Sequence, residues 1–290
     1  MTATPSDRTD RPALIRAEGV TVGYGSRSGS APILRSVDLE LRSGRTLGLV
    51  GESGSGKSTL ARALVGLLRP SAGRVLHEGR DLASASRREL AALRRSVQLV
   101  PQDPYASLNP RMTVGAAIAE AVDPRRASLR AHRAEVERWL GLVALDPDAA
   151  ERYPHAFSGG QRQRIAVARA LAARPRVVIA DEITSALDCS VQAEVLNVLA
   201  DLREELDLTM LFISHDLSVV RLVSDDVAVL YQGRVVERGE AHEVLGGSPR
   251  HPYTRLLLDS VPDGRELSPP PGGTTGGTGT GARVREARGA

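Results

Sequence analysis

The segment from Gly51 to Ser58 reads Gly-Glu-Ser-Gly-Ser-Gly-Lys-Ser, and it limits the folds open to this chain more than any other feature. It matches the pattern G-x-x-x-x-G-K-[ST], in which glycines let successive backbone N–H groups turn inward around phosphate oxygens. Such a loop needs a buried strand before it and a helix after it. Residues 46–50 form a short, mostly apolar run, and Leu60, Leu64, Leu67 and Leu68 follow at helical spacing. The segment therefore predicts a phosphate-binding loop between a strand and a helix.

Lys57 is the one lysine among the 38 lysine and arginine residues of the chain. Arginine is a broad planar fork and lysine a compact ammonium on a thin stem, so a tight loop that needs a slender point charge should keep its lysine. We expect Lys57 to reach the β and γ phosphates of a nucleotide and Ser58 to hold Mg²⁺, helped by the partial positive charge of the helix N-terminus. The alternative is a glycine-rich turn without a ligand. The candidate ATP-binding residues of the loop are Gly51, Glu52, Ser53, Gly54, Ser55, Gly56, Lys57, Ser58 and Thr59.

The composition is that of a soluble globular protein, with 41% hydrophobic and 25% charged residues. No apolar run approaches the roughly 18 to 20 residues that a membrane helix needs, and the first twenty residues show no signal-peptide core. The single cysteine, Cys189, excludes an internal disulfide and an all-cysteine metal site, as is typical of proteins in a reducing cytoplasm. We therefore expect a chain that does not span a membrane by itself.

The net charge of +3 could indicate a nucleic-acid surface. The arginines of residues 87–95 and 125–133, however, alternate with glutamates in helix-like stretches, as on an ordinary solvated face. Aromatic residues make up 3% of the chain, and none interleave with these arginines as a base-stacking platform would require. We expect no nucleic-acid partner.

The apolar pattern predicts the α/β fold class. Alternation in residues 20–24 and 37–41 indicates half-buried strands of an antiparallel β layer. Short apolar strands expected in a covered parallel sheet, separated by helices, lie at residues 97–100, 177–180, 210–213 and 227–230. Residues 112–139 have a helical pattern and look like an insertion. From about residue 264 the chain is rich in Gly, Pro and Thr, and we expect residues 264–290, like residues 1–12, to be without fixed structure.

Polar residues follow several of these strands. Asp181 and Glu182 end the strand at 177–180, and ligands of open α/β sheets bind beyond the carboxyl ends of strands. We expect Asp181 to orient Mg²⁺, and Glu182 to polarise the water that attacks the γ-phosphorus. His215 follows the strand at 210–213 and could donate to the γ-phosphate, whereas Gln102 follows the strand at 97–100 and could touch metal or water. The alternative is that these are ordinary packed or exposed polar side chains that bind no ligand.

A second helix start suited to anions lies far along the chain. Its residues are Ser158, Gly159, Gly160 and Gln161, with Ser158 as the N-cap. One nucleotide is not expected to fill both this turn and the Lys57 loop within one subunit, because the two belong to different subdomains. The sequence thus favours a head-to-tail dimer in which the turn of one chain closes on the γ-phosphate held by the other.

The order of these motifs resembles the ATP-binding subunit of an ABC transporter over roughly residues 13–245. In that family the motifs are Walker A, the Q-loop (Gln102), the signature (Ser158 to Gln161), Walker B, the D-loop (Ser185 and Asp188) and the switch histidine. The resemblance implies a P-loop NTPase (RecA-like) core, an antiparallel β layer and a helical subdomain of about residues 103–170. It also places Tyr24 where the family stacks an aromatic on adenine, although a core tyrosine is the alternative.

Residues 102–111 and the run His251-Pro252-Tyr253-Thr254 resemble the oligopeptide, dipeptide and nickel importer branch, which implies a C-terminal extension over residues 246–263. Phe157 and Ile183 depart from the residues usual in the family, but neither replaces a phosphate-contacting group. Some members of this branch ligate an iron-sulfur cluster through cysteines near the C-terminal segment. With Cys189 alone, this chain is expected to have none.

The resemblance implies an ATPase that binds ATP and Mg²⁺ and energises peptide import from the cytoplasmic face of the cell membrane. The implied partners are a second ATP-binding subunit, identical or related, two transmembrane permease subunits and, indirectly, an extracytoplasmic solute-binding protein. An importer for nickel or another small solute stays open. A soluble ABC ATPase acting on nucleic acid or ribosomes is a further alternative, although no heptad run lies between Lys57 and Asp181. A P-loop kinase would have no use for the Ser158 helix or Asp188.

Overall fold

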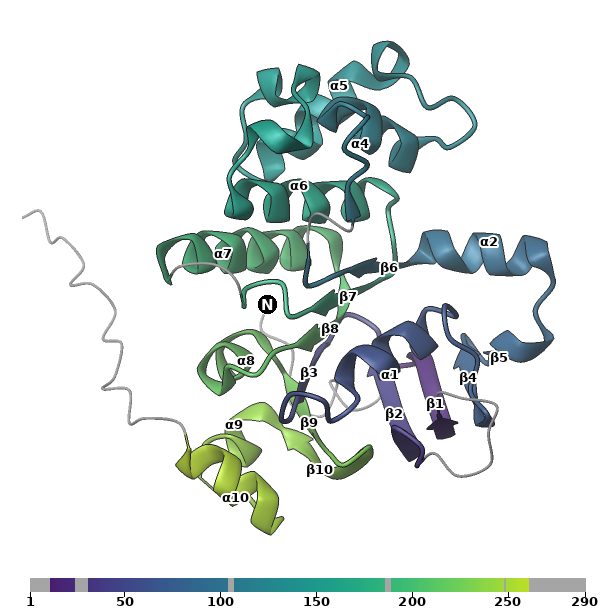
Figure 1. The fold of residues 1–290 in the computed structure, drawn as a ribbon, viewed down its shortest axis with the longest axis vertical. Coiled ribbons are helices and arrows are strands. Elements are labelled where there is room, and N and C mark those ends of the chain that lie inside the picture. Colours follow the sequence, from purple (N-terminus) through teal and green to yellow (C-terminus); the bar gives the residue numbers. More distant parts are fainter. Residues whose placement is uncertain (1–10, 24–30, 104–106, 186–188, 248, 261–290) are drawn as a thin grey trace, which may run out of the picture. The chain divides into compact units, whose positions relative to one another are not determined.

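The computed structural model of this chain describes residues 11–23, 31–103, 107–185, 189–247 and 249–260. Within them, one sheet has the strand order β2-β1-β4-β5 with antiparallel pairs, and the other has the order β10-β9-β3-β8-β7-β6 (Figure 1). The second sheet is parallel apart from the antiparallel pair of β9 and β10. The strands are β1 (Ala13–Val22), β2 (Leu34–Arg42), β3 (Thr46–Val50), β4 (Ala72–His77), β5 (Arg80–Asp81), β6 (Val97–Val100), β7 (Val177–Asp181), β8 (Thr209–Ile213), β9 (Asp226–Tyr231) and β10 (Arg234–Glu240).

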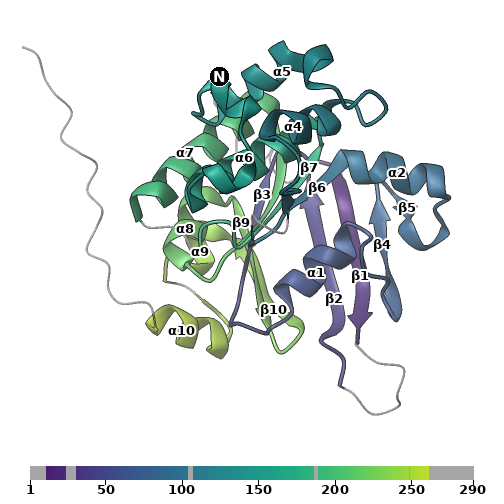
Figure 2. The same ribbon diagram turned by 45° about the horizontal axis from the view of Figure 1, so that its top comes forward.

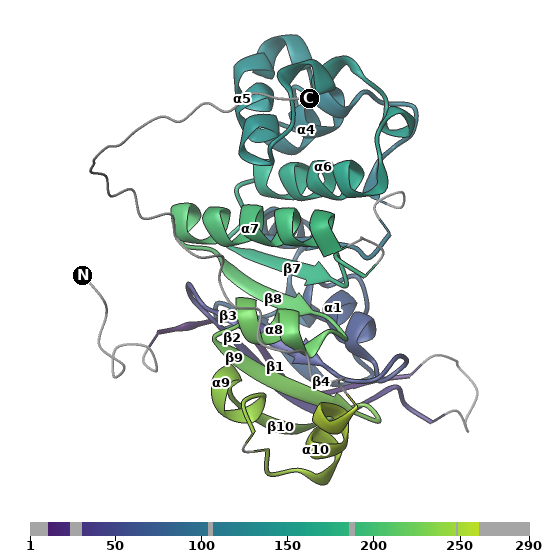
Figure 3. The same ribbon diagram turned by 90° about the vertical axis from the view of Figure 1, so that its left-hand side faces the viewer.

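Helices separate most of the parallel strands along the chain. They are α1 (Lys57–Leu64), α2 (Arg87–Ser96), α4 (Val114–Val122), α5 (Leu129–Leu142), α6 (Gly159–Ala172), α7 (Cys189–Leu206), α8 (Leu217–Val223), α9 (Ala241–Val244) and α10 (Pro252–Asp259). Helices α4, α5 and α6 pack on one another, and α6 lies on α7 (Figure 3). Helix α6 also contacts β6. Among the described helices, none is long and apolar enough to cross a membrane.

The core that holds the phosphate loop lies between the two sheets. Because side chains alternate along a strand, β1 and β2 each turn one apolar set inward, and these sets pack with α1 and with β3. Figure 2 shows α1 beside β1, the strand that it contacts. The most deeply buried members of this cluster include Ile15, Leu39, Leu41, Leu49, Leu60 and Leu64. The strand before the loop and the helix after it are therefore both anchored in one apolar cluster.

The expected fold class is confirmed, down to the antiparallel layer and the helical region between β6 and β7. One detail was wrong: the leucine spacing predicted a helix continuing to Leu68, but α1 ends at Leu64. Gly66 has a φ of 69°, in the left-handed region that ends many helices. Leu67 consequently leaves the core and is 61% exposed.

Parallel pairing brings the carboxyl ends of the central strands to one level. Ile213 of β8 is paired with Leu49 of β3 on one side and with Asp181 of β7 on the other, and Val100 of β6 is paired with Ala180. Segments that leave β3, β6, β7 and β8 therefore start at the same edge of the sheet. The polar residues expected to act together follow these strands.

Candidate active site

The phosphate loop connects β3 to α1 as residues 51–56. At Gly51, φ is 154° and an added Cβ would lie 2.2 Å from the Leu230 carbonyl oxygen, so only glycine fits there. Lys57 is 4% exposed, and its Nζ donates to the carbonyl oxygens of Gly51 (2.9 Å) and Glu52 (3.0 Å). The ammonium is thus held against its own loop, where its positive charge can attract a bound phosphate.

The first turn of α1 suits an anion. Gly56 precedes the helix in the left-handed conformation, gives no side-chain cap, and no acidic residue occupies the first turn. The N–H groups of that turn have no intrahelical acceptor, and the helix dipole adds positive charge. Ser55 Oγ is buried and has no hydrogen-bond partner among the described residues. Because buried polar groups are nearly always hydrogen-bonded, this hydroxyl is suited to bind a ligand oxygen. The loop residues Glu52, Ser53 and Gly54 are exposed, whereas Ser58 and Thr59 are half-buried.

Asp181 and Ser58 meet as expected from the sequence. The Ser58 hydroxyl donates to Asp181 Oδ1 at 3.1 Å, although 123 positions separate the two residues. Burial raises the pKa of Asp181 above its usual value, against the opposing effect of the Ser58 hydrogen bond. A hydroxyl oxygen and a carboxylate oxygen this close form a donor pair of the kind that Mg²⁺ takes beside nucleotide phosphates.

Glu182 lies at the centre of the site. Its φ is 49°, an uncommon conformation for a residue other than glycine, and its N–H donates to the Ile213 carbonyl oxygen at 2.9 Å. Its Oε1 lies 3.6 Å from Lys57 Nζ, and its Oε2 accepts a 2.9 Å hydrogen bond from Gln102 Nε2. A carboxylate that is 17% exposed and held between an ammonium and an amide is well placed to act on a water beside a bound phosphate.

The other predicted residues of this edge surround Glu182. Gln102 Nε2 also donates to Ser185 Oγ at 3.3 Å, and Ser185 Oγ donates to the Glu182 carbonyl oxygen at 2.9 Å. His215 Nδ1 lies 3.9 Å from Glu182 Oε2, and the imidazole is 61% exposed. Asp216, which follows, caps α8 and so fixes the chain beside His215. Two candidates, Tyr24 and Asp188, lie outside the described residues.

The serine-glycine turn packs in a different part of the chain. Ser158 caps α6, as the sequence predicted, and the structure adds a capping box with Gln161. Ser158 and Gly159 are exposed, whereas Gly160 is buried against α7, where an added Cβ would lie 2.1 Å from Val191 Cγ1. Helix α6 packs on α4, α5 and α7, whereas α1 packs on β1 and β7. Of the four residues expected to contact a nucleotide in another subunit, Ser158 and Gly159 thus face outward and Gln161 is half-buried, whereas Gly160 packs inside.

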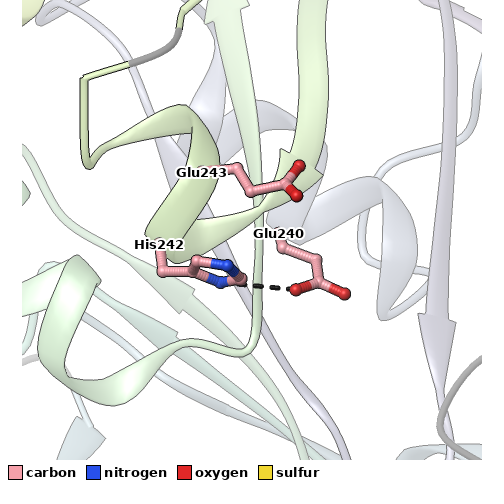
Figure 4. A group of neighbouring side chains, drawn as sticks. All are labelled: Glu240, His242 and Glu243. Carbon is pink, nitrogen blue, oxygen red and sulfur yellow. Dashed lines mark ion pairs between the residues drawn. The ribbon is translucent and has the colours of Figure 1, made fainter. Parts of the chain in front are cut away.

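Another group of ionisable side chains lies away from this edge. Glu240 is the last residue of β10, and His242 and Glu243 belong to α9; one ligand atom from each lies within 4.8 Å of the others (Figure 4). All three residues are exposed, and His242 Nδ1 lies 3.3 Å from Glu240 Oε2. This is an ordinary surface ion pair, and we assign no metal to it.

Sequence reasoning missed one residue at the phosphate loop. The Tyr253 hydroxyl, on α10, accepts a 3.0 Å hydrogen bond from the Glu52 backbone N–H. In the sequence, Tyr253 stands out only as part of the run of residues 251–254, which resembles the oligopeptide, dipeptide and nickel importer branch. No local signal could have placed it here, because 201 positions separate it from Glu52.

The ABC transporter family model matches residues 34–185, which include the phosphate loop, Gln102, Ser158, Asp181 and Glu182. This chain belongs to the ABC transporter ATP-binding family. A putative peptide import ATP-binding protein of Brucella ovis is 47% identical over 250 residues, which cover 86% of this chain and 78% of the relative. The oligopeptide transport ATP-binding protein AppF of Bacillus subtilis is 48% identical over 241 residues, or 82% of this chain and 73% of that protein.

Solved structures of the family share this fold. The structure of cbiO1 from Clostridium perfringens, part of the ABC transporter complex cbiONQ, has a TM-score of 0.72 and 28% identity, and covers 82% of this chain and 92% of its own. A cassette solved as a dimer in a post-hydrolysis state with ADP and Pi has a TM-score of 0.70 and 28% identity, over 79% of this chain and 99% of its own. This ABC cassette is accordingly an ATPase that binds and hydrolyses ATP.

Proposed function

We propose that this ABC ATPase energises the uptake of peptides, as one of two ATP-binding subunits beneath a pair of membrane-spanning permeases. Its relatives carry names of peptide and oligopeptide import proteins at 47 to 52% identity. The single observation that carries the catalytic part is the position of Glu182 between Gln102 and Lys57. The chain would work at the cytoplasmic face of the cell membrane as a peripheral subunit.

In the proposed mechanism, Lys57 and the N–H groups of the first turn of α1 hold the phosphates of ATP. Ser58 and Asp181 would hold Mg²⁺, which neutralises phosphate charge when bound, and Gln102 would touch the metal or its water. Glu182 takes a proton from the attacking water, and His215 donates to the γ-phosphate. Each of these side chains lies at the edge where the parallel strands end.

The second half of the proposed site comes from a partner subunit. Ser158 and Gly159 are exposed at the start of α6 in this chain, so they are free to approach a nucleotide held by another copy or a related subunit. Asp188 and Ser185 would lie between the two sites, and Tyr24 would stack on adenine. Closure around ATP and opening after hydrolysis would rock the permeases.

We assign the chain's segments on the same basis. Residues 13–245 would form the ATPase domain, including a helical subdomain at about residues 103–170, and residues 246–263 an extension typical of the peptide-importer branch.

Reconstitution tests the proposal. The chain would be co-purified with its permease pair and any related ATPase subunit into liposomes, together with the solute-binding protein, and uptake of labelled peptide and of ⁶³Ni²⁺ would be compared. Peptide uptake that requires ATP supports the proposal, whereas uptake of nickel alone would indicate that the chain belongs to a nickel importer. A chain that stays soluble in the presence of the permeases and hydrolyses ATP only with nucleic acid or ribosomes would overturn the importer function.

A further inference from the structure

The Tyr253 hydroxyl touches the phosphate loop at a peptide unit that Lys57 also holds. The Gly51 carbonyl and the Glu52 N–H belong to the same peptide group, between residues 51 and 52. Lys57 Nζ donates to the Gly51 carbonyl oxygen at 2.9 Å, and the Glu52 N–H donates to Tyr253 Oη at 3.0 Å. One peptide group is thus bound at both ends, and bonds arranged in such a chain polarise and strengthen one another.

This peptide group needs an outside constraint. Gly51 has no side chain, and its φ of 154° lies where few other residues are found, so the adjoining peptide is easily rotated. A rotation would carry the Gly51 carbonyl away from Lys57 and would break the hydrogen bond from the Glu52 N–H to Tyr253. The Lys57 ammonium would then lose one of the two carbonyl acceptors that fix its direction.

The phenol is itself firmly held. The ring of Tyr253 stacks on that of Tyr231, at the end of β9, with centroids 4.0 Å apart, and the residue is 6% exposed. The N-terminal end of α10 is tied to β10, because the Glu237 carboxylate accepts hydrogen bonds from the N–H groups of Arg250 (2.6 Å) and His251 (3.0 Å). The position of the hydroxyl is therefore set by the second sheet rather than by the loop.

The phenol keeps one ionisation state over the working pH range. Burial raises the pKa of Tyr253 above its usual value of 10, so the hydroxyl stays neutral near pH 7. A neutral hydroxyl accepts the Glu52 N–H without bringing a negative charge to a loop that must bind phosphate.

We infer that Tyr253 is a positioning residue for ATP: its hydroxyl fixes the 51–52 peptide, and through it the Lys57 ammonium, so that α10 forms part of the support of the phosphate loop. The inference rests on the proposed role of Lys57 in ATP binding. It adds to the nucleotide site a residue of α10, which lies outside the family-model match of residues 34–185. Helix α10 thereby contributes to ATP binding.

The test is Tyr253→Phe in the full chain, with Tyr231→Phe as the matched control. Both variants keep the stacked ring pair, but only Tyr253→Phe removes an acceptor from the loop, because the Tyr231 hydroxyl accepts from Gln232 Nε2 instead. Loss of one such hydrogen bond should raise KM and Kd for ATP roughly 2- to 10-fold. Hydrogen exchange of the Glu52 amide should become faster in Tyr253→Phe and stay unchanged in Tyr231→Phe.

The outcomes separate the possible explanations. A structural defect would lower kcat with the fraction of folded protein and leave KM unchanged, and that result would overturn the inference. So would an unchanged KM together with unchanged exchange at Glu52. Exchange is read without ATP, so the inference can be judged even if a variant loses activity. If Lys57→Ala binds ATP as well as the parent chain does, the proposed role of Lys57 fails instead.

Discussion

Lys57 Nζ lies 3.6 Å from Glu182 Oε1, so the ammonium of the phosphate loop and the carboxylate that follows β7 form an ion pair across the site. Lys57 begins the helix after β3 and Glu182 follows β7, and the parallel pairing of both strands with β8 brings the two groups together. A phosphate bound by the ammonium is therefore brought beside the carboxylate. In the proposed mechanism, this geometry would link nucleotide binding to hydrolysis.

Replacing Glu182 by Gln should separate these two functions. The amide cannot take a proton, so ATP hydrolysis should fall by about 10² or more, whereas ATP binding should stay close to that of the parent chain. Phosphate release and equilibrium dialysis measure the two quantities. Glu205→Gln, which alters an exposed ion pair with Arg138, is the control and should hydrolyse normally. Normal turnover in Glu182→Gln would remove the catalytic assignment.

The Lys57→Arg variant tests why one lysine persists among so many arginines. The planar guanidinium is broader than the ammonium and cannot fit both carbonyl acceptors at 2.9 and 3.0 Å in a buried loop. We expect ATP affinity to fall about tenfold or more, measured by titration calorimetry. The reverse exchange at an exposed position of the same helix, Arg62→Lys, should have little effect. Equal affinity in both variants would contradict the steric argument.

Gly159 and Gly160 should respond differently to alanine. At Gly160 the new Cβ would lie 2.1 Å from Val191 Cγ1, so the helices must shift and the midpoint of thermal unfolding should fall, as for an overpacked core costing about 1 to 3 kcal/mol. At Gly159 nothing lies within 4 Å of the added Cβ, so Gly159→Ala should fold normally. If Gly159 approaches a nucleotide in the partner subunit, that variant should still lose ATPase activity. Full activity in folded Gly159→Ala would argue against the proposed dimer.

Asp181→Asn should lower ATPase activity and raise the stability of the folded chain. Burial raises the pKa of Asp181 in the folded state, so the folded chain holds its proton more tightly than the unfolded chain does. The stabilisation from the protonated form is present at low pH and is lost as the pH rises through the folded-state pKa, so the ionised group opposes folding at pH 7. The neutral amide should raise the midpoint of thermal unfolding at pH 7 without nucleotide, and should lower magnesium-dependent hydrolysis. A lower midpoint at pH 7 would refute this reading.

His77 should make the fold sensitive to acid. Burial lowers the pKa of His77 to about 4, from a usual value of 6.5, and its Nε2 has no hydrogen-bond partner among the described residues. The unfolded chain therefore binds more protons between pH 6.5 and 4, and the free energy of unfolding should fall as the pH is lowered through that window. Denaturant titrations of His77→Leu should show a weaker pH dependence there. The exposed His242→Asn is the control and should behave like the parent chain.

The fold was largely predictable because its central strands are short apolar runs with clear ends. The run at residues 46–50 became β3, and that at 97–100 became β6. By contrast, β4 has three exposed residues among its six and β10 has few deeply buried ones, so neither leaves an apolar pattern in the sequence. Such a strand pairs through its backbone, which nearly every residue type supplies.

The candidate site was predictable in part for the same reason. Asp181, His215 and Gln102 each follow a strand that the sequence indicates, and parallel strands end at one edge. The hydrogen bond between Glu52 and Tyr253 could not be foreseen, since it depends on where α10 comes to lie after the second sheet has formed. The left-handed backbone at Glu182 likewise depends on its hydrogen bond to the neighbouring strand and has no signal in the residue itself.

The solitary lysine gives this protein a built-in reporter. Apart from an α-amino group, Lys57 is the sole primary amine that the sequence offers to an acylating reagent, and its side chain is 4% exposed. Guanidinium groups resist such reagents, so modification of Lys57 would be read as a single change in mass besides that of an α-amino group. Comparing the rate of Lys57 modification with and without nucleotide would therefore report whether the loop is occupied, without an added label.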